Sequence, residues 1–392
     1  MTKIPEWWEK IKLSNLIEIK HGFAFKWEYI SDTDNWIVLL TPWNFLIWWW
    51  RKEWKKRYTW EIPSDYILKG WDLVVTMTDL SKDWDTLWYP ALIPNDESRT
   101  FLHNQRIWFV TITNEKIDKM FLYYLMRNRE YQKFIVNFAS WSTVRHTSPD
   151  RIRSYEFFLP TKDEQKIIAK TLSSFDDKIE LLRAENQTLE EMGQTLFKER
   201  FGKYKAWDEL PDGWKVGKLG DIVDNYDSKR IPIASDKREI WEYPYYWATG
   251  INWYVKDYIF DWIYTLLWED WSVMKENWKP FTQYVWWKIR VNNHAHVLQW
   301  KNWFSTEIIK IILDSVDITP YVTWAVQLKI SQWNMNSIPV IIPTDDVLVK
   351  FNSLINPIFA KIRANSEEIE SLSKTRDQLL PKLMSWEVRV EF

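Results

Sequence analysis

The sequence predicts an α+β protein in which two tandem globular domains are separated by two long helices that pair antiparallel within the chain as a coiled coil. Two observations carry this prediction: a heptad pattern of apolar residues appears after Pro160 and again after Pro343, and short motifs recur in the same order before each helix. Pro160 and Pro343 are 183 residues apart, and so are Trp141 and Trp324 in the matching loops. We therefore expect a pseudo-twofold chain divided at 1–159, 160–203, 204–342 and 343–392.

The first globular domain is expected to combine strands with one amphipathic helix. Helical periodicity predicts that helix over 119–138. Short apolar runs bounded by turn residues predict strands at 13–19, 37–40, 73–77, 107–112 and 155–159. The basic run at 51–57 is the densest cationic segment, and it suits either a nucleic-acid contact or a solvated loop.

The first long helix is predicted from a seam that starts after Pro160. Thr161 followed by Glu164 forms a capping box, and Arg200 followed by Gly202 is typical of a helix end. The seam positions alternate four and three residues apart, at Ile168, Leu172, Phe175, Ile179, Leu182, Asn186, Leu189, Gly193 and Leu196. A helix with such a stripe needs an apolar partner.

The second half of the chain repeats this plan. Pro211-Asp212-Gly213-Trp214 opens it as Pro5-Glu6-Trp7-Trp8 opens the first half, 206 residues earlier. Asp345 and Asp346 follow Pro343 and suit a helix N-terminus. The second seam consists of Phe351, Ile355, Ile358, Ile362, Asn365, Ile369, Leu372, Arg376, Leu379 and Leu383.

The two seams match in one antiparallel register. This register sets Ile168 against Leu383 and brings Asn186 to Asn365. A buried Asn pair fixes the register of a coiled coil at some cost in stability. We therefore predict that the two asparagines meet and determine how the helices align.

Composition narrows the class of protein. The 392 residues carry a net charge of −2, so binding to nucleic acid must rest on local basic patches. The chain has no cysteine, which excludes disulfides and thiolate metal sites and weakly favours a reducing compartment. It shows no signal peptide and no apolar run of membrane-spanning length, so we expect a cytoplasmic protein without a membrane partner.

Tryptophan is abnormally abundant in this chain and glycine is abnormally rare. There are 31 Trp and 8 Gly, whereas glycine normally makes up about 7% of residues. Trp7 also stands where the second repeat has Gly213. Several tryptophans follow Asp or Asn, where glycine would complete a tight turn: Trp84, Trp271, Trp278 and Trp303. We hypothesise that most of the tryptophans are UGA codons that the source organism reads as glycine.

No catalytic signature accompanies this architecture. The sequence has neither a Gly-x-x-x-x-Gly-Lys-Ser/Thr phosphate loop nor a His-Glu-x-x-His zinc helix. Asn356-Pro357-Ile358-Phe359 lacks the second proline of a methyltransferase loop and lies on the seam. Glu18-Ile19-Lys20 resembles part of a nuclease motif, but only Glu6 and Glu9 precede it as a second acid. We therefore expect no catalytic residue and no metal site.

The order and duplication of the motifs resemble the specificity subunit of type I restriction–modification enzymes. The similarity rests on the Pro-x-Gly-Trp opening with Leu219-Gly220-Asp221-Ile222, on the Ser/Thr loops, and on Glu164-Gln165-Lys166-Ile167-Ile168-Ala169 at the first helix. It covers essentially the whole chain. The departures are the tryptophans, most of which would be glycine in the family pattern, and Leu348, where the second copy lacks Glu-Gln.

The resemblance implies a non-catalytic DNA-specificity subunit with target recognition domains at 1–159 and 204–342. Each domain would read one half of a split sequence in double-stranded DNA, while the paired helices set the distance between the halves and dock the methyltransferase (modification) subunits. A restriction/translocase subunit would complete the complex. The chain itself would hold no cofactor, because S-adenosylmethionine, ATP and Mg would be used by the partner subunits.

Candidates for contacts with DNA are polar or basic residues beside the predicted turns. Arg, Lys, Asn and Gln can pair bidentately with purine edges, while Thr suits phosphates or single acceptors. The first domain offers Lys20, His21, Thr76, Thr78, Arg106, Thr143, Arg145 and His146. The second domain offers Lys229, Arg230, Thr249, Asn252, Asn292, Asn293, His294 and Gln327. For each of them, a solvated or turn-capping role is the competing interpretation.

The sequence leaves two other classes of function open. A stand-alone restriction nuclease or modification enzyme with an unrecognised site would cleave or methylate DNA by itself. A coiled-coil scaffold would show no salt-dependent DNA binding. The duplicated globular domains count against the scaffold, which has no need of two similar readers.

Overall fold

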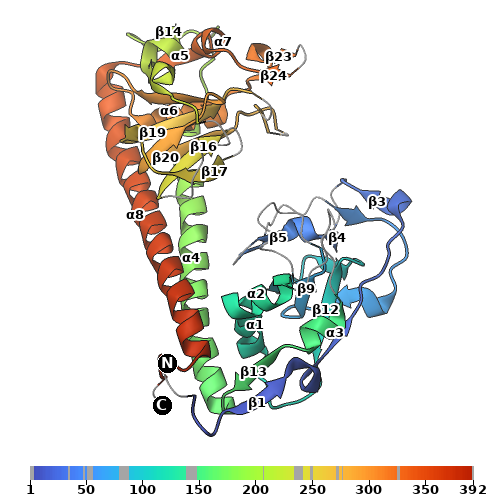
Figure 1. Ribbon diagram of the computed structural model, residues 1–392. Helices are drawn as coiled ribbons and strands as arrows, with labels where there is room; N and C mark the ends of the chain where they lie inside the picture. Colours follow the sequence, from blue (N-terminus) through green and yellow to red (C-terminus); the bar gives the residue numbers. More distant parts are fainter. Residues whose placement is uncertain are drawn as a thin grey trace. The chain divides into compact units, whose positions relative to one another are not determined.

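The computed structural model divides into two compact units, each of which contains part of both long helices (Figure 1). Unit 1 consists of residues 1–179 and 371–392, and unit 2 consists of residues 180–370. The structure describes residues 4–33, 36–46, 49–50, 56–78, 88–137, 148–205, 207–233, 242–247, 250–270, 273–275, 277–324 and 327–390. Among these residues, no helix combines the length and the apolar character that crossing a bilayer requires.

Unit 1 is built on small sheets and short helices. Its strands are β1 (Glu9–Lys12), β2 (Ile17–Lys20), β3 (Ile30–Ser31), β4 (Ile37–Leu40), β5 (Phe45–Leu46), β6 (Trp49–Trp50), β7 (Arg57–Tyr58), β8 (Ile67–Leu68), β9 (Leu73–Thr76), β10 (Pro90–Leu92), β11 (Thr100–His103), β12 (Ile107–Ile112) and β13 (Glu156–Leu159). Its helices are α1 (Lys119–Arg127), α2 (Arg129–Asn137), α3 (Pro149–Arg153) and the first part of α4 (Lys162–Arg200). The sheet orders are β10-β9-β12-β2, β3-β7-β4-β11-β8, β1-β13 and β5-β6.

Two predicted elements of unit 1 differ from the structure. The strand expected over 13–19 begins only at Ile17, because Leu13–Asn15 forms a 3₁₀ turn that buries Leu13. The helix expected over 119–138 is divided at Asn128, whose ψ of 138° is extended rather than helical. Both corrections fall at Ser or Asn residues, whose side chains compete with the backbone hydrogen bonds of regular structure.

Unit 2 follows the same plan with its own sheets. Its strands are β14 (Lys215–Lys218), β15 (Val223–Asn225), β16 (Tyr243–Trp247), β17 (Gly250–Val255), β18 (Phe260–Asp261), β19 (Tyr264–Trp268), β20 (Thr282–Val285), β21 (Lys288–Val291), β22 (Ala295–Trp300), β23 (Thr323–Trp324), β24 (Leu328–Lys329) and β25 (Pro339–Ile342). Its helices are α5 (Leu219–Ile222), α6 (Thr306–Ser315), α7 (Gln332–Asn336) and most of α8 (Asp345–Met384). The sheet orders are β15-β22-β19-β20, β17-β16-β21-β18, β14-β25 and β23-β24.

The repeat predicted from motif spacing is present in the elements of the two units. Strand β14 starts 206 residues after β1, and strand β25 starts 183 residues after β13. Each of these pairs forms the same antiparallel ladder, β1 with β13 and β14 with β25. The predicted fold class, an α+β chain with two tandem domains and two long helices that pack together, is confirmed.

In unit 1, helix α4 begins at an anchored corner. The Thr161 hydroxyl donates to Glu164 Oε2 at 2.8 Å, and Glu164 Oε2 also accepts from the Thr161 backbone N–H at 2.9 Å, so the predicted capping box forms. The buried Gln165 side chain donates to the carbonyls of Lys116 and Pro160, both at 2.9 Å, and accepts from the Asp118 N–H at 2.7 Å. The Glu-Gln pair therefore ties the start of α4 to the segment that caps α1.

The long helices pair antiparallel within each unit. In unit 1, Ile168 and Leu172 of α4 share a core with Leu380 and Leu383 of α8. In unit 2, Asn365 Nδ2 donates to Asn186 Oδ1 at 2.9 Å, and Asn186 Nδ2 donates to Ser366 Oγ at 3.1 Å. Asn365 is 1% exposed, so this contact is a buried polar pair inside the seam. The predicted register at Asn186 and Asn365 is confirmed.

Replacing Asn365 with leucine is expected to lower the free energy of unfolding of unit 2 by about 1–3 kcal/mol, because Asn186 Oδ1 loses its donor. The double replacement, Asn186→Leu with Asn365→Leu, should recover most of this loss, since both polar groups leave together. Urea unfolding followed by circular dichroism measures the difference. A double variant that is less stable than either single variant would contradict this account.

In unit 1, one position of the heptad seam holds a charged residue, whereas its neighbours in the seam are apolar. Arg376 of α8 is 3% exposed and donates to Asp176 Oδ1 of α4 at 2.6 Å and to Asp377 Oδ1 at 2.9 Å. Asp176 Oδ2 also accepts from the Tyr124 hydroxyl at 2.8 Å and lies 3.5 Å from Arg127 NH1. Since Tyr124 and Arg127 belong to α1, this network joins the globular part of unit 1 to both long helices.

Candidate nucleic-acid interface

Three of the candidates in unit 1 lie together at one edge of the sheet β10-β9-β12-β2. Strand β2 ends at Lys20 and is paired with β12, while Arg106 lies in the turn that precedes β12. The Met77 N–H donates to the Arg106 carbonyl at 2.8 Å, which brings the end of β9 to the same edge. Lys20, His21 and Arg106 are all exposed, so their polar groups are accessible to a ligand.

Gly22 allows the chain after β2 to lie close against the turn at Asn104. A Cβ at Gly22 would lie 1.9 Å from the Asn104 carbonyl oxygen, so no larger residue fits against the turn. The Phe23 N–H donates to the His103 carbonyl at 3.1 Å in the same crossing. Gly22 therefore determines that His21 projects beside the turn that carries Arg106.

The other described candidates of unit 1 are inside the domain. Thr76 and Thr78 are fully buried, so neither offers its hydroxyl to the surface. Neighbouring His103 is also buried; burial, and secondarily the charge of Lys20, lower its pKa to about 4. A neutral His103 contributes packing, against Tyr66, rather than a positive charge. Thr143, Arg145 and His146 lie outside the described residues.

In unit 2 the exposed candidates are Lys229, Asn293 and Gln327, and His294 is half-buried. His294 Nδ1 lies 2.8 Å from Asp270 Oδ1. Asn292 is buried, so its amide is not at the surface. Thr249 lies outside the described residues, and the Asn252 side chain is likewise not described.

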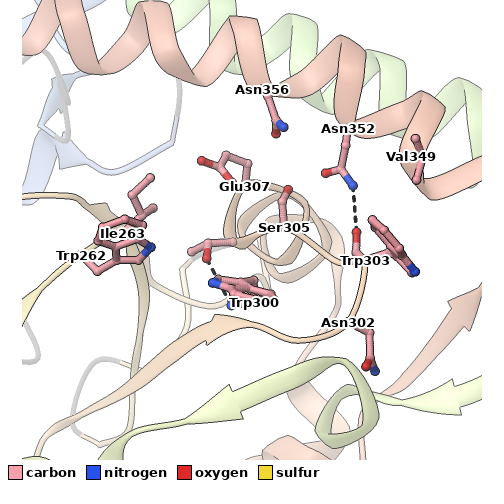
Figure 2. Close-up of a pocket in the computed structure, with 11 residues that line it drawn as sticks. Trp262, Ile263, Trp300, Asn302, Trp303, Ser305, Glu307, Val349, Asn352 and Asn356 are labelled. Atoms are coloured by element: carbon pink, nitrogen blue, oxygen red, sulfur yellow. Dashed lines mark hydrogen bonds between the residues drawn. The ribbon is translucent and has the colours of Figure 1, made fainter. Parts of the chain in front are cut away.

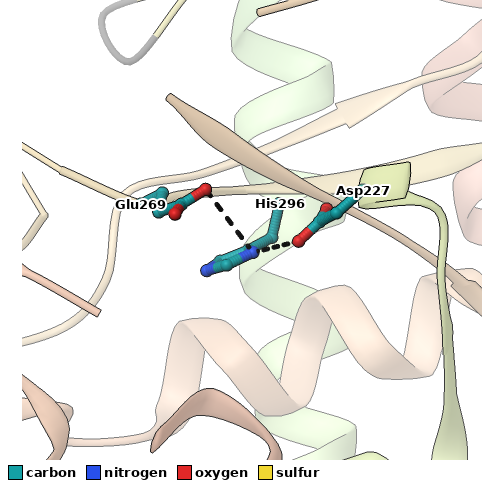
Figure 3. Close-up of side chains that lie close together, drawn as sticks. All are labelled: Asp227, Glu269 and His296. Atoms are coloured by element: carbon teal, nitrogen blue, oxygen red, sulfur yellow. Dashed lines mark hydrogen bonds and ion pairs between the residues drawn. The ribbon is translucent and has the colours of Figure 1, made fainter. Parts of the chain in front are cut away.

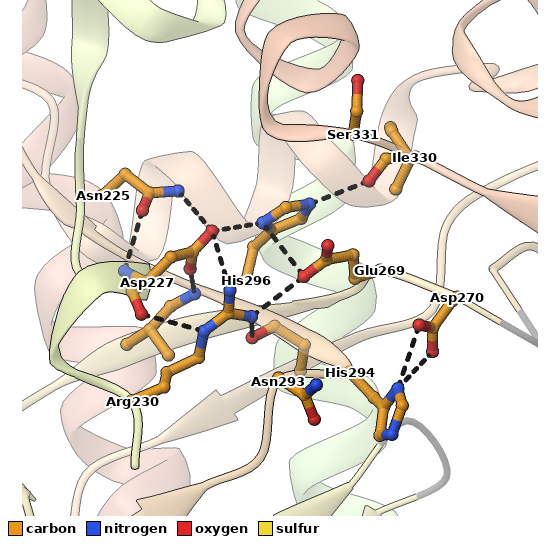
Figure 4. A network of polar contacts seen from close by, with 12 residues as sticks. Asn225, Asp227, Arg230, Glu269, Asp270, Asn293, His294, His296, Ile330 and Ser331 are labelled. Carbon is orange, nitrogen blue, oxygen red and sulfur yellow. Dashed lines mark hydrogen bonds and ion pairs between the residues drawn. The ribbon is translucent and has the colours of Figure 1, made fainter. Parts of the chain in front are cut away.

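Arg230 belongs to a polar network rather than to the free surface (Figure 4). Its NH1 donates to Glu269 Oε2 at 2.9 Å and to the Ala295 carbonyl at 2.7 Å. Its Nε donates to the Asp227 carbonyl at 3.1 Å. Because Arg230 donates to these acceptors inside the domain, it positions the start of β22 and the turn that carries Asn293 and His294.

His296 lies at the centre of this network, between two carboxylates (Figure 3). Its Nδ1 is 2.5 Å from Asp227 Oδ2 and 3.9 Å from Glu269 Oε2, while its Nε2 is 2.9 Å from the Ile330 carbonyl. Both ring nitrogens therefore face oxygen atoms inside the domain. His296 is 1% exposed, so these contacts hold a buried ring.

Asp227, Glu269 and His296 are residue types that bind metal ions, and their ligand atoms lie within 4.8 Å of one another. Positive charge is already supplied to them, however, by Arg230 and by Lys329, whose Nζ is 3.2 Å from Glu269 Oε1. A metal would also require His296 Nδ1 to be unprotonated. The arrangement therefore acts as an internal ion-pair network.

Sequence reasoning missed the acidic half of this network and Lys329. Asp227 and His296 are 69 residues apart, and no periodicity connects them. In the sequence, the two histidines only alternate, His294 just before β22 and His296 within it. The acidic partners of the two rings depend on how the sheet closes.

The chain is similar in sequence to known proteins. A family profile described as the type I restriction modification DNA specificity domain matches residues 5–191 and 211–372. The MjaIX type I restriction enzyme specificity subunit of Methanocaldococcus jannaschii is 28% identical over 310 residues, which cover 71% of this chain and 71% of that protein. The EcoBI specificity subunit of Escherichia coli is 27% identical over 199 residues, which cover 50% of this chain and 37% of that protein.

A likeness of fold accompanies the likeness of sequence. The crystal structure of the type I restriction–modification S subunit from M. genitalium aligns over 97% of this chain and 98% of that chain, with a TM-score of 0.52 and 18% identity. The family profile covers both repeats and most of the chain. On that ground, the chain belongs to the type I restriction modification DNA specificity family.

Proposed function

We propose that this chain is the non-catalytic DNA-specificity subunit of a type I restriction–modification complex, in which each repeat reads one half of a split target. The observation that carries this function is the duplication: the family's specificity domain matches at 5–191 and again at 211–372, and both repeats contain the same pair of terminal strands. Two similar readers on one chain suit a target with two separate half-sites.

The target recognition domains are proposed at 1–159 and 204–342, with the intervening and C-terminal segments, 160–203 and 343–392, supplying the paired helices. In each domain we assign DNA contacts to the exposed candidates. These are Lys20, His21 and Arg106 in the first domain, and Lys229, Asn293 and Gln327 in the second, together with the half-buried His294. Arginine and asparagine suit direct reading of purine edges in the major groove, whereas lysine suits phosphates.

The partners follow from the same assignment. Double-stranded DNA is the ligand, the methyltransferase subunits dock on the paired helices, and a restriction/translocase subunit joins the complex. We propose that S-adenosylmethionine, ATP and Mg act in those partners and that this chain holds none of them. The proposed location is the cytoplasm, where such a complex meets DNA.

Mapping of methylated bases tests this function. A host that expresses the chain together with its neighbouring methyltransferase is expected to acquire one split methylated motif, which disappears when the chain is deleted. Methylation that is unchanged by the deletion would contradict the proposal. Methylation or cleavage by the isolated chain would instead support a stand-alone enzyme, and absence of salt-dependent DNA binding would support a scaffold.

Single substitutions assign the half-sites. Arg106→Ala is expected to relax the sequence at one half-site and leave the other half unchanged, because a lost bidentate contact costs about 1–3 kcal/mol of discrimination, or roughly 5–150-fold. Lys10→Ala, which removes an exposed residue of β1 paired with Glu156, is the matched control and should leave both half-sites unchanged. Equal loss at both half-sites in Arg106→Ala would contradict the assignment of one unit to one half-site.

A further inference from the structure

Tryptophan occupies backbone conformations in this structure that normally require glycine. Among the described residues, five non-glycine positions have positive φ, and four of them are tryptophan. They are Trp71 (φ 68°), Trp88 (φ 61°), Trp278 (φ 65°) and Trp386 (φ 65°), and the fifth is Asn302 (φ 57°). Asn tolerates the left-handed region, but a bulky aromatic residue there is a genuine outlier.

Trp71 is at the glycine position of a tight turn. The Asp72 N–H donates to the Lys69 carbonyl at 3.1 Å, which closes a four-residue turn with Gly70 and Trp71 at its centre. Only Trp71 of these two central residues has positive φ, so the turn is of type II. The third residue of a type II turn is normally glycine, because a Cβ is strained there.

Trp278 is at the glycine position of a hairpin. Its N–H donates to the Lys275 carbonyl at 3.0 Å, and the Lys275 N–H donates to the Lys279 carbonyl at 2.8 Å, so the chain reverses between these two lysines. A left-handed residue at the end of such a hairpin loop is normally glycine. Trp278 is left-handed, and its side chain is 54% exposed, so burial compensates little for the strain.

Trp386 and Trp88 extend the pattern to a helix end and to the core. Trp386 follows the last turn of α8, where a left-handed residue ends the helix and glycine is the usual choice. Trp88 is fully buried, yet its indole N–H has no hydrogen-bond partner. The indole nitrogen of Trp8, which has no positive φ, also lacks a partner, so the backbone conformation and not the unpartnered indole separates the two classes.

We propose that the protein made in its own cells carries glycine at positions 71, 88, 278 and 386, because the codon translated here as tryptophan is read there as glycine. Composition alone does not say which tryptophans are recoded. A left-handed backbone conformation at a tryptophan identifies it as a recoded glycine. The inference is independent of the DNA-specificity function, since it concerns the identity of residues at turns.

The same criterion identifies genuine tryptophans. Trp8 and Trp214 occupy equivalent positions 206 residues apart, and neither has positive φ. Trp8 is buried, and the Trp214 ring lies 5.7 Å from Phe201 and 5.0 Å from Tyr204. These two side chains pack at the start of each repeat, as an aromatic residue should. They are therefore the matched controls for the four left-handed positions.

Recoding also changes how one pocket of unit 2 is interpreted. A pocket of about 340 Å³ is lined by Trp262, Trp300 and Trp303 together with polar groups, including Asn352 (Figure 2). Asn352 Nδ2 donates to the Trp303 carbonyl at 2.8 Å, and Asn302-Trp303 is a two-residue hairpin turn in which Asn302 alone has positive φ. Of the three tryptophans only Trp303 is suspected from composition, and none has positive φ, so recoding bears on this pocket at Trp303 alone.

Peptide mass spectrometry of the protein purified from its source cells decides the inference. The expected peptides contain glycine at 71, 88, 278 and 386 and tryptophan at 8 and 214, and the gene is expected to carry UGA at the first four positions and UGG at the last two. Tryptophan in the peptides at the four left-handed positions would overturn the inference. Glycine at 8 or 214 would overturn the backbone criterion.

A recombinant comparison adds a physical readout. Trp71→Gly and Trp278→Gly, both at side chains more than half exposed, are each expected to raise the melting temperature by about 2–4 °C, because the left-handed strain is relieved and little packing is lost. Trp214→Gly should lower it, because the contacts with Phe201 and Tyr204 are lost. Unchanged or lower melting temperatures for Trp71→Gly and Trp278→Gly would contradict the inference.

Discussion

Asp176→Asn is expected to lower the free energy of unfolding of unit 1 by about 3–5 kcal/mol, the cost of leaving buried charges without their partner. Asp176 accepts from Arg376 at 2.6 Å and from Tyr124 at 2.8 Å, and it lies 3.5 Å from Arg127. Arg127 and Arg376 are both almost completely buried, so without this carboxylate both guanidinium groups lose an acidic neighbour inside the protein. Urea unfolding at neutral pH, followed by circular dichroism, measures the loss.

The partner substitution should cost less. Arg376→Met restores an apolar side chain at a seam position, and Asp176 keeps its contacts with Tyr124 and Arg127. Arg376 also donates to Asp377, a partly exposed neighbour whose charge water can reach. We therefore expect a loss of about 1.5–3 kcal/mol, that of hydrogen bonds to a charged group. Equal costs for Asp176→Asn and Arg376→Met would show that Arg127 does not share the carboxylate.

A surface pair provides the control for this comparison. Lys116 and Glu9 form an ion pair at 2.8 Å, with both side chains more than half exposed. Glu9→Gln should change the free energy of unfolding by less than about 1 kcal/mol, because water screens exposed pairs. The double variant, Asp176→Asn with Arg376→Met, should be non-additive by about 0.5–3 kcal/mol, as contacting residues usually are.

The sequence pattern predicted the strands and the helix register that depend on residues close together in the sequence or on regular heptad spacing. Strands β4 and β12 were predicted over their observed ranges, because their apolar runs are bounded by turn residues. The pairing of Asn186 with Asn365 followed from the heptad spacing, since a polar residue in a seam is stable only opposite another. The 3₁₀ turn at Leu13–Asn15 was missed because Ser14 and Asn15 redirect the backbone within an apolar run.

The candidate interface was less predictable because burial is a property of the whole domain. Thr76 and Arg106 both lie beside turns, yet Thr76 is the last residue of strand β9 and is fully buried, whereas Arg106 lies in the turn before β12 and is exposed. Arg376 was visible as an exception in the seam, but its compensation by Asp176 depends on a contact 200 residues away. Sequence spacing identifies such residues, but the tertiary structure determines which residues they contact.

Asp227→Asn is expected to destabilise unit 2 by about 3–5 kcal/mol at neutral pH, because it removes the half-buried carboxylate that both His296 Nδ1 and Arg230 contact. An asparagine at this position would keep one oxygen for the Val297 N–H, which donates to Asp227 Oδ1 at 2.9 Å. Its amide group would then face His296 Nδ1, and two donors would oppose each other. Asp224→Asn, which neutralises an exposed acid on strand β15, is the control and should change stability by less than about 0.5 kcal/mol.

The effect of Asp227 should depend on pH in a defined direction. Burial by itself would raise the pKa of Asp227, but the hydrogen bond and charge of His296 and the charge of Arg230 outweigh burial and hold the pKa below its ordinary value of 3.8. A carboxylate whose pKa is lowered on folding adds stability that is complete above its unfolded pKa and is lost as the pH falls through the folded pKa. The difference in free energy of unfolding between the parent chain and Asp227→Asn should therefore shrink below about pH 4. A difference of the same size at pH 7 and pH 3 would show that Asp227 acts through its shape rather than through its charge.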